Sequence, residues 1–168
     1  MDLNKLTTGD KIIGISGILL FIFSFFPWLG AKVELRGATV LNPSDNAWHF
    51  TLTLLATLIG VLLVAYVAAR AGGVEFPKLG SVTWGQVVLV LAAVAFLFIF
   101  IKIITGPSGV TTGSFAGGSI SKTRKIGIFL GLIASGGMVA GAYLNVKEAG
   151  ELPGSLGGST GGATPPAP

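Results

Sequence analysis

The sequence predicts an all-α membrane protein, in which a bundle of four transmembrane helices is followed by a disordered C-terminal tail. Hydrophobic side chains make up 51% of the 168 residues, charged ones only 11%, and the mean hydropathy is +0.81. A soluble domain carries about 25% charged residues, so this chain has too few of them to cover a surface that faces water. Four apolar stretches also reach the roughly 20 residues with which a helix crosses a hydrocarbon core of about 30 Å.

The four apolar stretches define a predicted transmembrane domain over residues 1–149. None of them has Asp, Glu, Arg or His in its middle, and each has lysine or arginine at or beside one end. Because lipid offers the backbone no hydrogen-bond partner, each stretch is expected to form a helix. The expected spans cover residues 12–29, 50–69, 84–104 and 126–146.

Aromatic residues support the same four spans. Every tryptophan and tyrosine falls near a span end, where an amphipathic ring fits among lipid headgroups. The predicted interface aromatics are Trp28 and Trp48 on one side of the membrane, and Tyr66, Trp84 and Tyr143 on the other. A cleaved signal peptide is the less favoured interpretation of the first span, because its apolar run is longer than that of a usual signal sequence.

Small residues spaced four apart predict where the helices pack. Lipid tails are as apolar as leucine, so membrane helices associate through close backbone approach at small side chains. The fourth span has two such rows and the second span has one. We expect the rows to pack the chain's own bundle, and the alternative is that one row of the fourth span contacts a partner subunit. The predicted helix-packing residues are Gly127, Gly131, Ser135, Gly137, Gly141, Ala56 and Gly60.

Basic residues near the span ends are expected to contact lipid headgroups. The predicted contacts are made by Lys102, Lys122, Arg124 and Lys125. Lys102 lies in the last turn of the third span, from which a lysine can extend to the interface. Lysine and arginine flank the spans in nearly equal numbers on the two sides. Because the first helix often dominates orientation, we favour cytoplasmic N- and C-termini in a bacterial inner membrane.

The two longer loops offer little chemistry. In the first loop, alternating apolar residues predict a short hairpin that turns at Arg36-Gly37. Asp45 and His49 follow it, but a pair lacks the third group that completes a triad or a metal site. In the third loop, Lys122-Thr123 lacks the preceding glycine of a phosphate-binding loop. That loop is expected to be a flexible connector with a basic end.

Composition excludes several classes of function. The chain has no cysteine and one histidine, which excludes a disulfide framework, a thiolate metal site and a cysteine nucleophile. The scattered basic residues do not form the stripe with which proteins bind nucleic acid. We therefore predict no enzyme activity, no catalytic residue, no metal site and no cofactor. Residues 150–168 are rich in Gly, Pro, Ser and Thr, a composition that predicts a disordered tail.

Short motifs at the span ends carry a family resemblance. They are Thr8-Gly9-Asp10, Phe26-Pro27-Trp28, the run from Lys102 to Pro107, the run from Lys125 to Gly131, and Gly141-Ala142-Tyr143-Leu144. With these motifs the chain resembles the small four-span integral membrane proteins of actinobacteria and other high-GC bacteria. That family has no assigned activity, so the resemblance implies a four-span fold and no catalytic residues.

Together these features predict a protein that acts by contact. The leading hypothesis is a non-enzymatic accessory or scaffold subunit, which sits in the lipid bilayer and contacts a membrane protein partner or copies of itself through its helices. The alternative is a small oligomeric channel or transporter for an uncharged or weakly polar solute. Ion-coupled transport is disfavoured. Its path is usually marked by ionisable groups at membrane depth, and the middles of the four expected spans have no Asp, Glu, Arg or His. A lipid-binding role for the basic end of the third loop is the third hypothesis.

Overall fold

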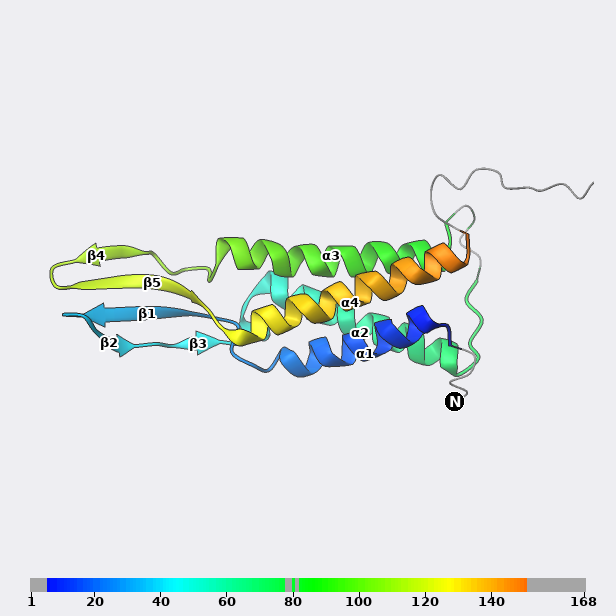
Figure 1. The fold of residues 1–168 in the computed structure, drawn as a ribbon, viewed down its shortest axis with the longest axis horizontal. Helices are drawn as coiled ribbons and strands as arrows, with labels where there is room; N and C mark the ends of the chain where they lie inside the picture. Colours follow the sequence, from blue (N-terminus) through cyan, green and yellow to red (C-terminus); the bar gives the residue numbers. More distant parts are fainter. Residues whose placement is uncertain (1–5, 78–79, 81, 151–168) are drawn as a thin grey trace, which may run out of the picture.

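Four helices and an antiparallel sheet make up the fold, in a computed structural model that describes residues 6–77, 80 and 82–150. The helices lie side by side, and the sheet projects from one end of the bundle (Figure 1). The helices are α1 (Thr8–Phe23), α2 (Thr51–Ala71), α3 (Trp84–Thr105) and α4 (Ile126–Glu148). The tail predicted over residues 150–168 falls, apart from Gly150, outside the described residues.

The sheet is built from the two connections that join α1 to α2 and α3 to α4. Its strands are β1 (Leu29–Leu35), β2 (Ala38–Leu41), β3 (Ser44–Asp45), β4 (Gly113–Phe115) and β5 (Gly118–Arg124). They are ordered β2-β1-β5-β4, with β3 also paired to β1. The ladder between β1 and β5 runs from Leu29 opposite Arg124 to Leu35 opposite Gly118, so it joins the two hairpins into one sheet.

The predicted hairpin turn at Arg36-Gly37 is confirmed. Leu35 pairs with Ala38, which leaves a two-residue loop between β1 and β2. Arg36 has φ +51° and Gly37 has φ +81°, the two positive values of a type I′ turn. The prediction of a flexible third loop is wrong, because β4 and β5 form a second hairpin there.

The predicted all-α, four-span fold class is also wrong. The described chain has mixed α and β structure, and three of its helices, α2, α3 and α4, are long and apolar enough to cross a membrane. Helix α1 has 16 residues, which at 1.5 Å per residue extend about 24 Å, less than a hydrocarbon core of about 30 Å. The expected first span continued to residue 29, but Leu29 already belongs to β1.

Local hydrogen bonds explain where α1 begins and ends. Thr7 and Asp10 form a capping box, so the helix starts four residues before the expected span. At the other end, the Ser24 hydroxyl donates to the Phe21 carbonyl at 2.6 Å, and Pro27 follows three residues later. The apolar residues after Ser24 therefore leave the helix. The other three helices begin and end within two residues of the expected ranges.

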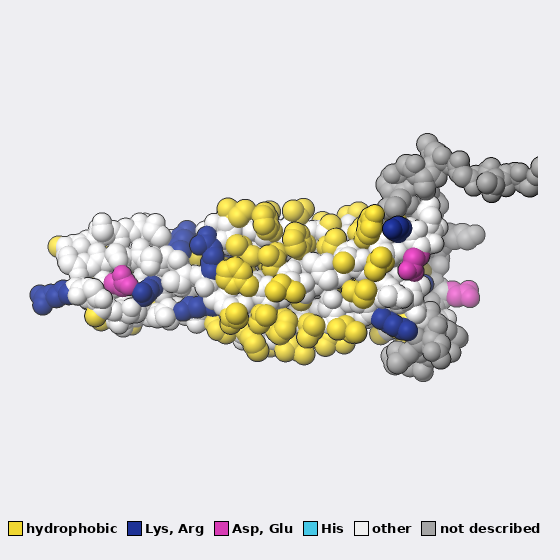
Figure 2. Space-filling model, viewed as in Figure 1, with side chains coloured by type: hydrophobic (Ala, Val, Ile, Leu, Met, Phe, Trp, Pro, Cys, Tyr) yellow, Lys and Arg dark blue, Asp and Glu magenta, His cyan; other side chains and the backbone are white. Residues whose placement is uncertain are grey.

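The bundle buries small and aliphatic side chains in its centre and exposes large apolar ones around it. Fully buried residues include Ile13 of α1, Leu63 of α2, Ile99 of α3 and Met138 of α4. Large apolar side chains form a belt over the outside of the bundle, while charged residues lie towards its two ends (Figure 2). Ile133 of α4, for example, is 72% exposed. Such a surface is compatible with a membrane protein.

Candidate functional site

The junction between sheet and bundle is built around Trp28, which was predicted to lie at the membrane interface. Its side chain is fully buried, and its Nε1 donates to the Phe23 carbonyl at 2.7 Å. The ring lies against the first glycine row of α4. A Cβ atom added at Gly131 would stand 2.5 Å from Trp28 Cη2, and one at Gly127 would stand 2.5 Å from Cδ1. This glycine row thus accommodates an indole ring rather than another helix.

The second glycine row of α4 faces α1. A Cβ atom added at Gly141 would stand 2.7 Å from the Gly9 carbonyl oxygen, and one at Gly137 would overlap the Ser16 hydroxyl. Where α2 packs against α1, a Cβ atom added at Gly60 of α2 would stand 2.9 Å from Cδ2 of Leu20 on α1. Both rows of α4 are therefore occupied within the chain. Of the remaining predicted packing residues, Ala56 and Ser135 are fully buried.

The basic residues of the third loop have partners within the chain. Arg124 donates to the carbonyls of Ile103 and Ile104, at 2.5 and 3.1 Å, and Lys122 lies 3.5 Å from the Thr105 carbonyl oxygen. These carbonyls end α3, where a helix lacks its own hydrogen-bond donors and its dipole favours positive charge. These two side chains thus cap the end of α3, and their contact with lipid headgroups stays a prediction.

Two further lysines near the same junction contact protein groups. Lys125 Nζ donates to Asn42 Oδ1 at 2.7 Å. Lys102 is only 5% exposed, and its ammonium donates to the Ser108 hydroxyl at 2.6 Å and lies 4.9 Å from the centre of the Phe50 ring. The expected extension of Lys102 to lipid headgroups is therefore not what the structure shows. A hydroxyl and an aromatic face stabilise its charge instead.

The first loop places Trp48, Asp45 and His49 close together at the sheet end. Trp48 Nε1 donates to the Ser24 hydroxyl at 3.0 Å, which joins the loop to the end of α1. His49 Nε2 lies 4.0 Å from Asp45 Oδ1, and the two side chains are 67% and 52% exposed. In the described part of the chain, no three His, Cys, Asp or Glu side chains stand close enough to hold a metal ion.

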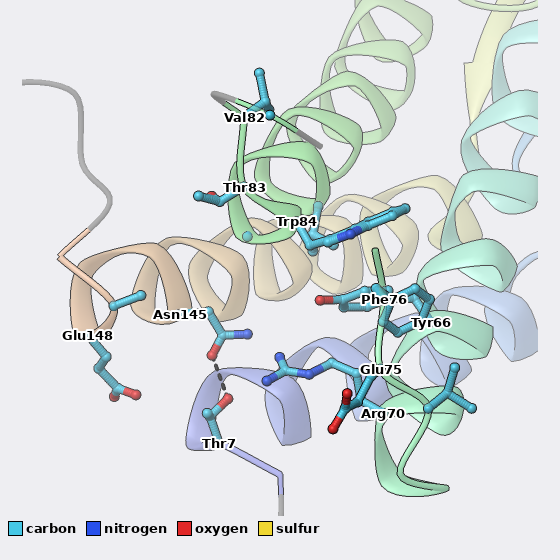
Figure 3. Close-up of a pocket in the computed structure, with 15 residues that line it drawn as sticks. Thr7, Tyr66, Arg70, Glu75, Phe76, Val82, Thr83, Trp84, Asn145 and Glu148 are labelled. Carbon is cyan, nitrogen blue, oxygen red and sulfur yellow. Dashed lines mark hydrogen bonds between the residues drawn. The ribbon is translucent and has the colours of Figure 1, made fainter. Parts of the chain in front are cut away.

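A pocket of about 840 Å³ opens at the other end of the bundle, away from the sheet (Figure 3). One wall carries the predicted interface aromatics Tyr66 and Trp84, with Phe76 packed against both rings at 5.0 Å between ring centres. Trp84 Nε1 donates to the Pro77 carbonyl at 2.7 Å, which holds Pro77, in the segment after α2, beside this wall. The polar and charged lining residues are Thr7, Arg70, Glu75, Thr83, Asn145 and Glu148.

A buried polar network supports the floor of this pocket. Asp10 is fully buried, and Arg70 Nη1 lies 2.9 Å from each of its carboxylate oxygens. Asn145 donates from Nδ2 to Asp10 Oδ1 at 2.8 Å, and the Thr7 hydroxyl donates to Asn145 Oδ1 at 2.6 Å. The network joins α1, α2 and α4, and it sets the position of the Arg70 guanidinium at the pocket.

Sequence reasoning did not find this network. The capping box of Thr7 and Asp10 was readable from their spacing. Arg70 and Asn145 are 60 and 135 positions away from Asp10, and nothing in the local pattern pairs them. Tyr143, predicted as an interface aromatic on this side, is 45% exposed and does not line the pocket.

An apolar groove of about 340 Å³ adjoins the pocket between α2 and α3. The two cavities share Tyr66, Phe76, Trp84 and Val88. From these shared residues the groove follows α2 back to Leu62 and α3 forward to Leu91, with aliphatic side chains on both sides. The polar pocket at the helix ends therefore adjoins an apolar surface along the helices, and the shared side chains lie between them.

Comparisons of the chain with protein families, curated proteins and solved structures find no match. The interpretation of both ends of the bundle therefore depends on their geometry, and the resemblance to small bacterial membrane proteins stays a prediction. The sheet end offers strand edges, and the opposite end offers a pocket with one guanidinium and two carboxylates.

Proposed function

We propose that the chain is a non-enzymatic, multi-pass protein of a bacterial inner membrane, which acts as an accessory or scaffold subunit by holding its sheet at a fixed position for a partner. Membrane insertion is supported by three helices that are long and apolar enough to cross a bilayer, and by the apolar belt around the bundle. Lipid tails would cover side chains such as Leu62, Leu97 and Ile133, which are 57%, 51% and 72% exposed.

The observation that carries the proposed contact role is the pair of open strand edges. Strands β2 and β4 end the order of the described sheet, and every residue of both strands is exposed. An edge strand has unpaired N–H and C=O groups, to which a partner can add a strand. Val40, Leu41 and Phe115 add apolar contact area there, at 52%, 62% and 47% exposure.

The junction makes the sheet a firm support for such contacts. Backbone bonds continue the β1–β5 ladder into the bundle, since Lys125 N–H donates to the Trp28 carbonyl and Gly127 N–H to the Pro27 carbonyl, at 2.8 and 3.0 Å. Arg124 joins the same strand to the end of α3. A partner on the sheet would therefore be held at a defined distance from the membrane.

A crosslinking experiment tests the contact role. A photoreactive amino acid replaces Val40 on the β2 edge, or Leu97 on the outer face of α3 as the control, in the full chain in native membranes. We expect one reproducible protein adduct from the Val40 position, its loss when Leu41→Lys is added, and no such adduct from Leu97. Absence of an adduct from Val40, or solute flux in liposomes that contain this protein alone, would contradict the proposal.

We also propose that the sheet faces the non-cytoplasmic side, because the N- and C-termini are predicted to be cytoplasmic and both described ends of the chain lie on the side away from the sheet. Thr7, before α1, and Asn145, near the end of α4, are hydrogen-bonded at the end of the bundle away from the sheet, so both described ends share one side. The chain has no cysteine, and Ser44 of β3 is exposed. In intact cells, Ser44→Cys should react with a membrane-impermeant thiol reagent. Reaction only after the membrane is opened would reverse the orientation.

A further inference from the structure

We propose that the pocket and the α2–α3 groove together bind one phospholipid with a zwitterionic, ammonium-phosphate headgroup. The headgroup lies in the pocket and one acyl chain lies in the groove. This binding site is separate from the sheet edges, and it depends on the proposed function only for its location in a membrane. Three observations carry it: the side chains that the two adjoining cavities share, the depth of the cavities, and the charges that line the pocket.

One cavity is polar and the other is apolar, as are the headgroup and the acyl chains of a lipid. The pocket carries charged and polar side chains at the ends of four helices, whereas the groove is lined by aliphatic side chains and the aromatic residues that both cavities share. Their volumes, about 840 and 340 Å³, lie in the range of small-molecule sites. A soluble metabolite would leave the apolar groove empty, and a hydrocarbon would leave the charged pocket unused.

The depth of the cavities also fits a lipid. Tyr66 and Trp84 lie at the boundary of pocket and groove, and such rings prefer the level of lipid headgroups. Between Trp84 and Leu91 the groove follows α3 for about 10 Å at 1.5 Å per residue, towards the middle of the bundle. This length matches the upper part of an acyl chain that enters from the surrounding bilayer.

Arg70 provides the phosphate contact. Its Nη1 donates to Asp10. Its guanidinium carbon lies 5.9 Å from the centre of the Tyr66 ring. Its Nε and Nη2 donors have no hydrogen-bond partner among the described residues. Its side chain is 35% exposed, and the guanidinium extends towards Thr7 and Asn145 in the pocket (Figure 3). A guanidinium has five donors in a planar fork, which binds phosphate oxygens in pairs.

The remaining charges select the headgroup. Asp10 already balances the charge of Arg70, so among the described lining residues Glu75 and Glu148 leave the pocket with net negative charge. A purely anionic headgroup would meet two unpaired carboxylates. An ammonium group close to the phosphate would instead satisfy a glutamate while the phosphate contacts Arg70. Phosphatidylethanolamine has this arrangement, and phosphatidylglycerol lacks the ammonium.

Native mass spectrometry of the full chain, delipidated in detergent and then supplied with each lipid, tests the proposal. We expect one phosphatidylethanolamine per chain, and at least fivefold lower occupancy by phosphatidylglycerol at equal concentration. Ala65→Phe fills the groove without touching the Asp10–Arg70 pair, and it should lower phosphatidylethanolamine occupancy at least fivefold. Val61→Phe is the matched control on α2, because Val61 is 40% exposed and does not line the groove.

A second variant tests the headgroup. Glu148→Gln removes one carboxylate from an exposed position and should reduce the preference for phosphatidylethanolamine over phosphatidylglycerol. Equal binding of the two lipids by the wild-type chain, no retained lipid, or unchanged occupancy in Ala65→Phe would overturn the proposal. Extraction of cell membranes at high pH tests separately whether the chain is an integral membrane protein, so failure of the lipid site can be distinguished from failure of the proposed membrane location. A chain that stays with the membrane but binds no phosphatidylethanolamine contradicts only the lipid site.

Discussion

Replacing Gly131 by alanine tests whether the first glycine row of α4 exists to accommodate Trp28. The new methyl group would stand 2.5 Å from Cη2 and 2.6 Å from Cζ2 of the indole. Carbon atoms in contact prefer about 3.5–4.0 Å, so the ring must move by about 1 Å. The ring has little room, because it is fully buried, its Nε1 is bonded to the Phe23 carbonyl, and Gly127 lies against its other edge.

The expected cost follows from three contributions. Overpacking of a well-filled core costs about 1–3 kcal/mol. Weakening of the bond between Trp28 Nε1 and Phe23 adds about 1 kcal/mol, while the higher helix propensity of alanine returns up to about 1 kcal/mol. The net loss for Gly131→Ala is therefore about 2 kcal/mol. Gly136→Ala on the same helix is the matched control, because its new methyl would meet only Phe96, at 3.7 Å.

The assay is unfolding of both variants in the same detergent, followed by circular dichroism during titration with sodium dodecyl sulfate. We expect Gly136→Ala to be as stable as wild type or more stable, and Gly131→Ala to be about 2 kcal/mol less stable than wild type, which is about 2–3 kcal/mol less stable than Gly136→Ala. Trp28→Phe should reduce the cost of Gly131→Ala, since the smaller ring leaves space for the methyl group. Equal stability of the two alanine variants would refute the role assigned to Gly131.

Three other substitutions test the polar contacts and the hairpin. Asp10→Asn should lower the free energy of unfolding by about 2 kcal/mol. This is less than the roughly 3–5 kcal/mol typical of a fully buried pair, because Arg70 is partly solvated. As a control, the exposed Asp45→Asn should change the free energy of unfolding by less than about 0.5 kcal/mol. Arg124→Gln removes charge from the end of α3 and should cost about 1 kcal/mol in the same titration, with a smaller loss at high salt. Arg36→Asn should stabilise the hairpin by about 0.5–1 kcal/mol, because asparagine adopts the φ of +51° seen there more readily than arginine. A loss of stability in Arg36→Asn would contradict the assignment of a type I′ turn.

Local patterns predicted the parts of the fold that local interactions determine. Long apolar runs indicated α2, α3 and α4, and alternation around Arg36-Gly37 indicated the first hairpin. Hydropathy alone failed at the end of α1, because apolar residues after Ser24 suit a buried junction as well as a membrane helix. It also failed at β5, whose glycine, serine and threonine residues resemble a loop until β1, about 90 positions earlier, pairs with them.

The same distinction applies to the candidate sites. Thr7 with Asp10, and Thr83 with Gln86, have the spacing of a capping box, and both boxes are present, but hydropathy alone placed the start of the first helix at residue 12. The contacts of Asp10 with Arg70 and Asn145 depend on how three helices pack, so no short pattern reveals them. For the same reason the pocket could not be predicted, although two of its aromatic residues had been placed at the correct end of the bundle.

The two ends of the bundle differ in how they hold their polar groups, and this difference separates their proposed roles. At the sheet end, Arg124, Lys122 and Lys125 bond to protein oxygens, so their charges stabilise the junction between α3 and the sheet. At the other end, Arg70 is fixed by one buried carboxylate, while Glu75 and Glu148 remain exposed in an open pocket. A junction whose charges are paired within the chain favours a rigid support for contacts made by the strands. A pocket that leaves guanidinium donors and carboxylates available favours a small, charged ligand, so mutations at one end should leave the activity of the other intact.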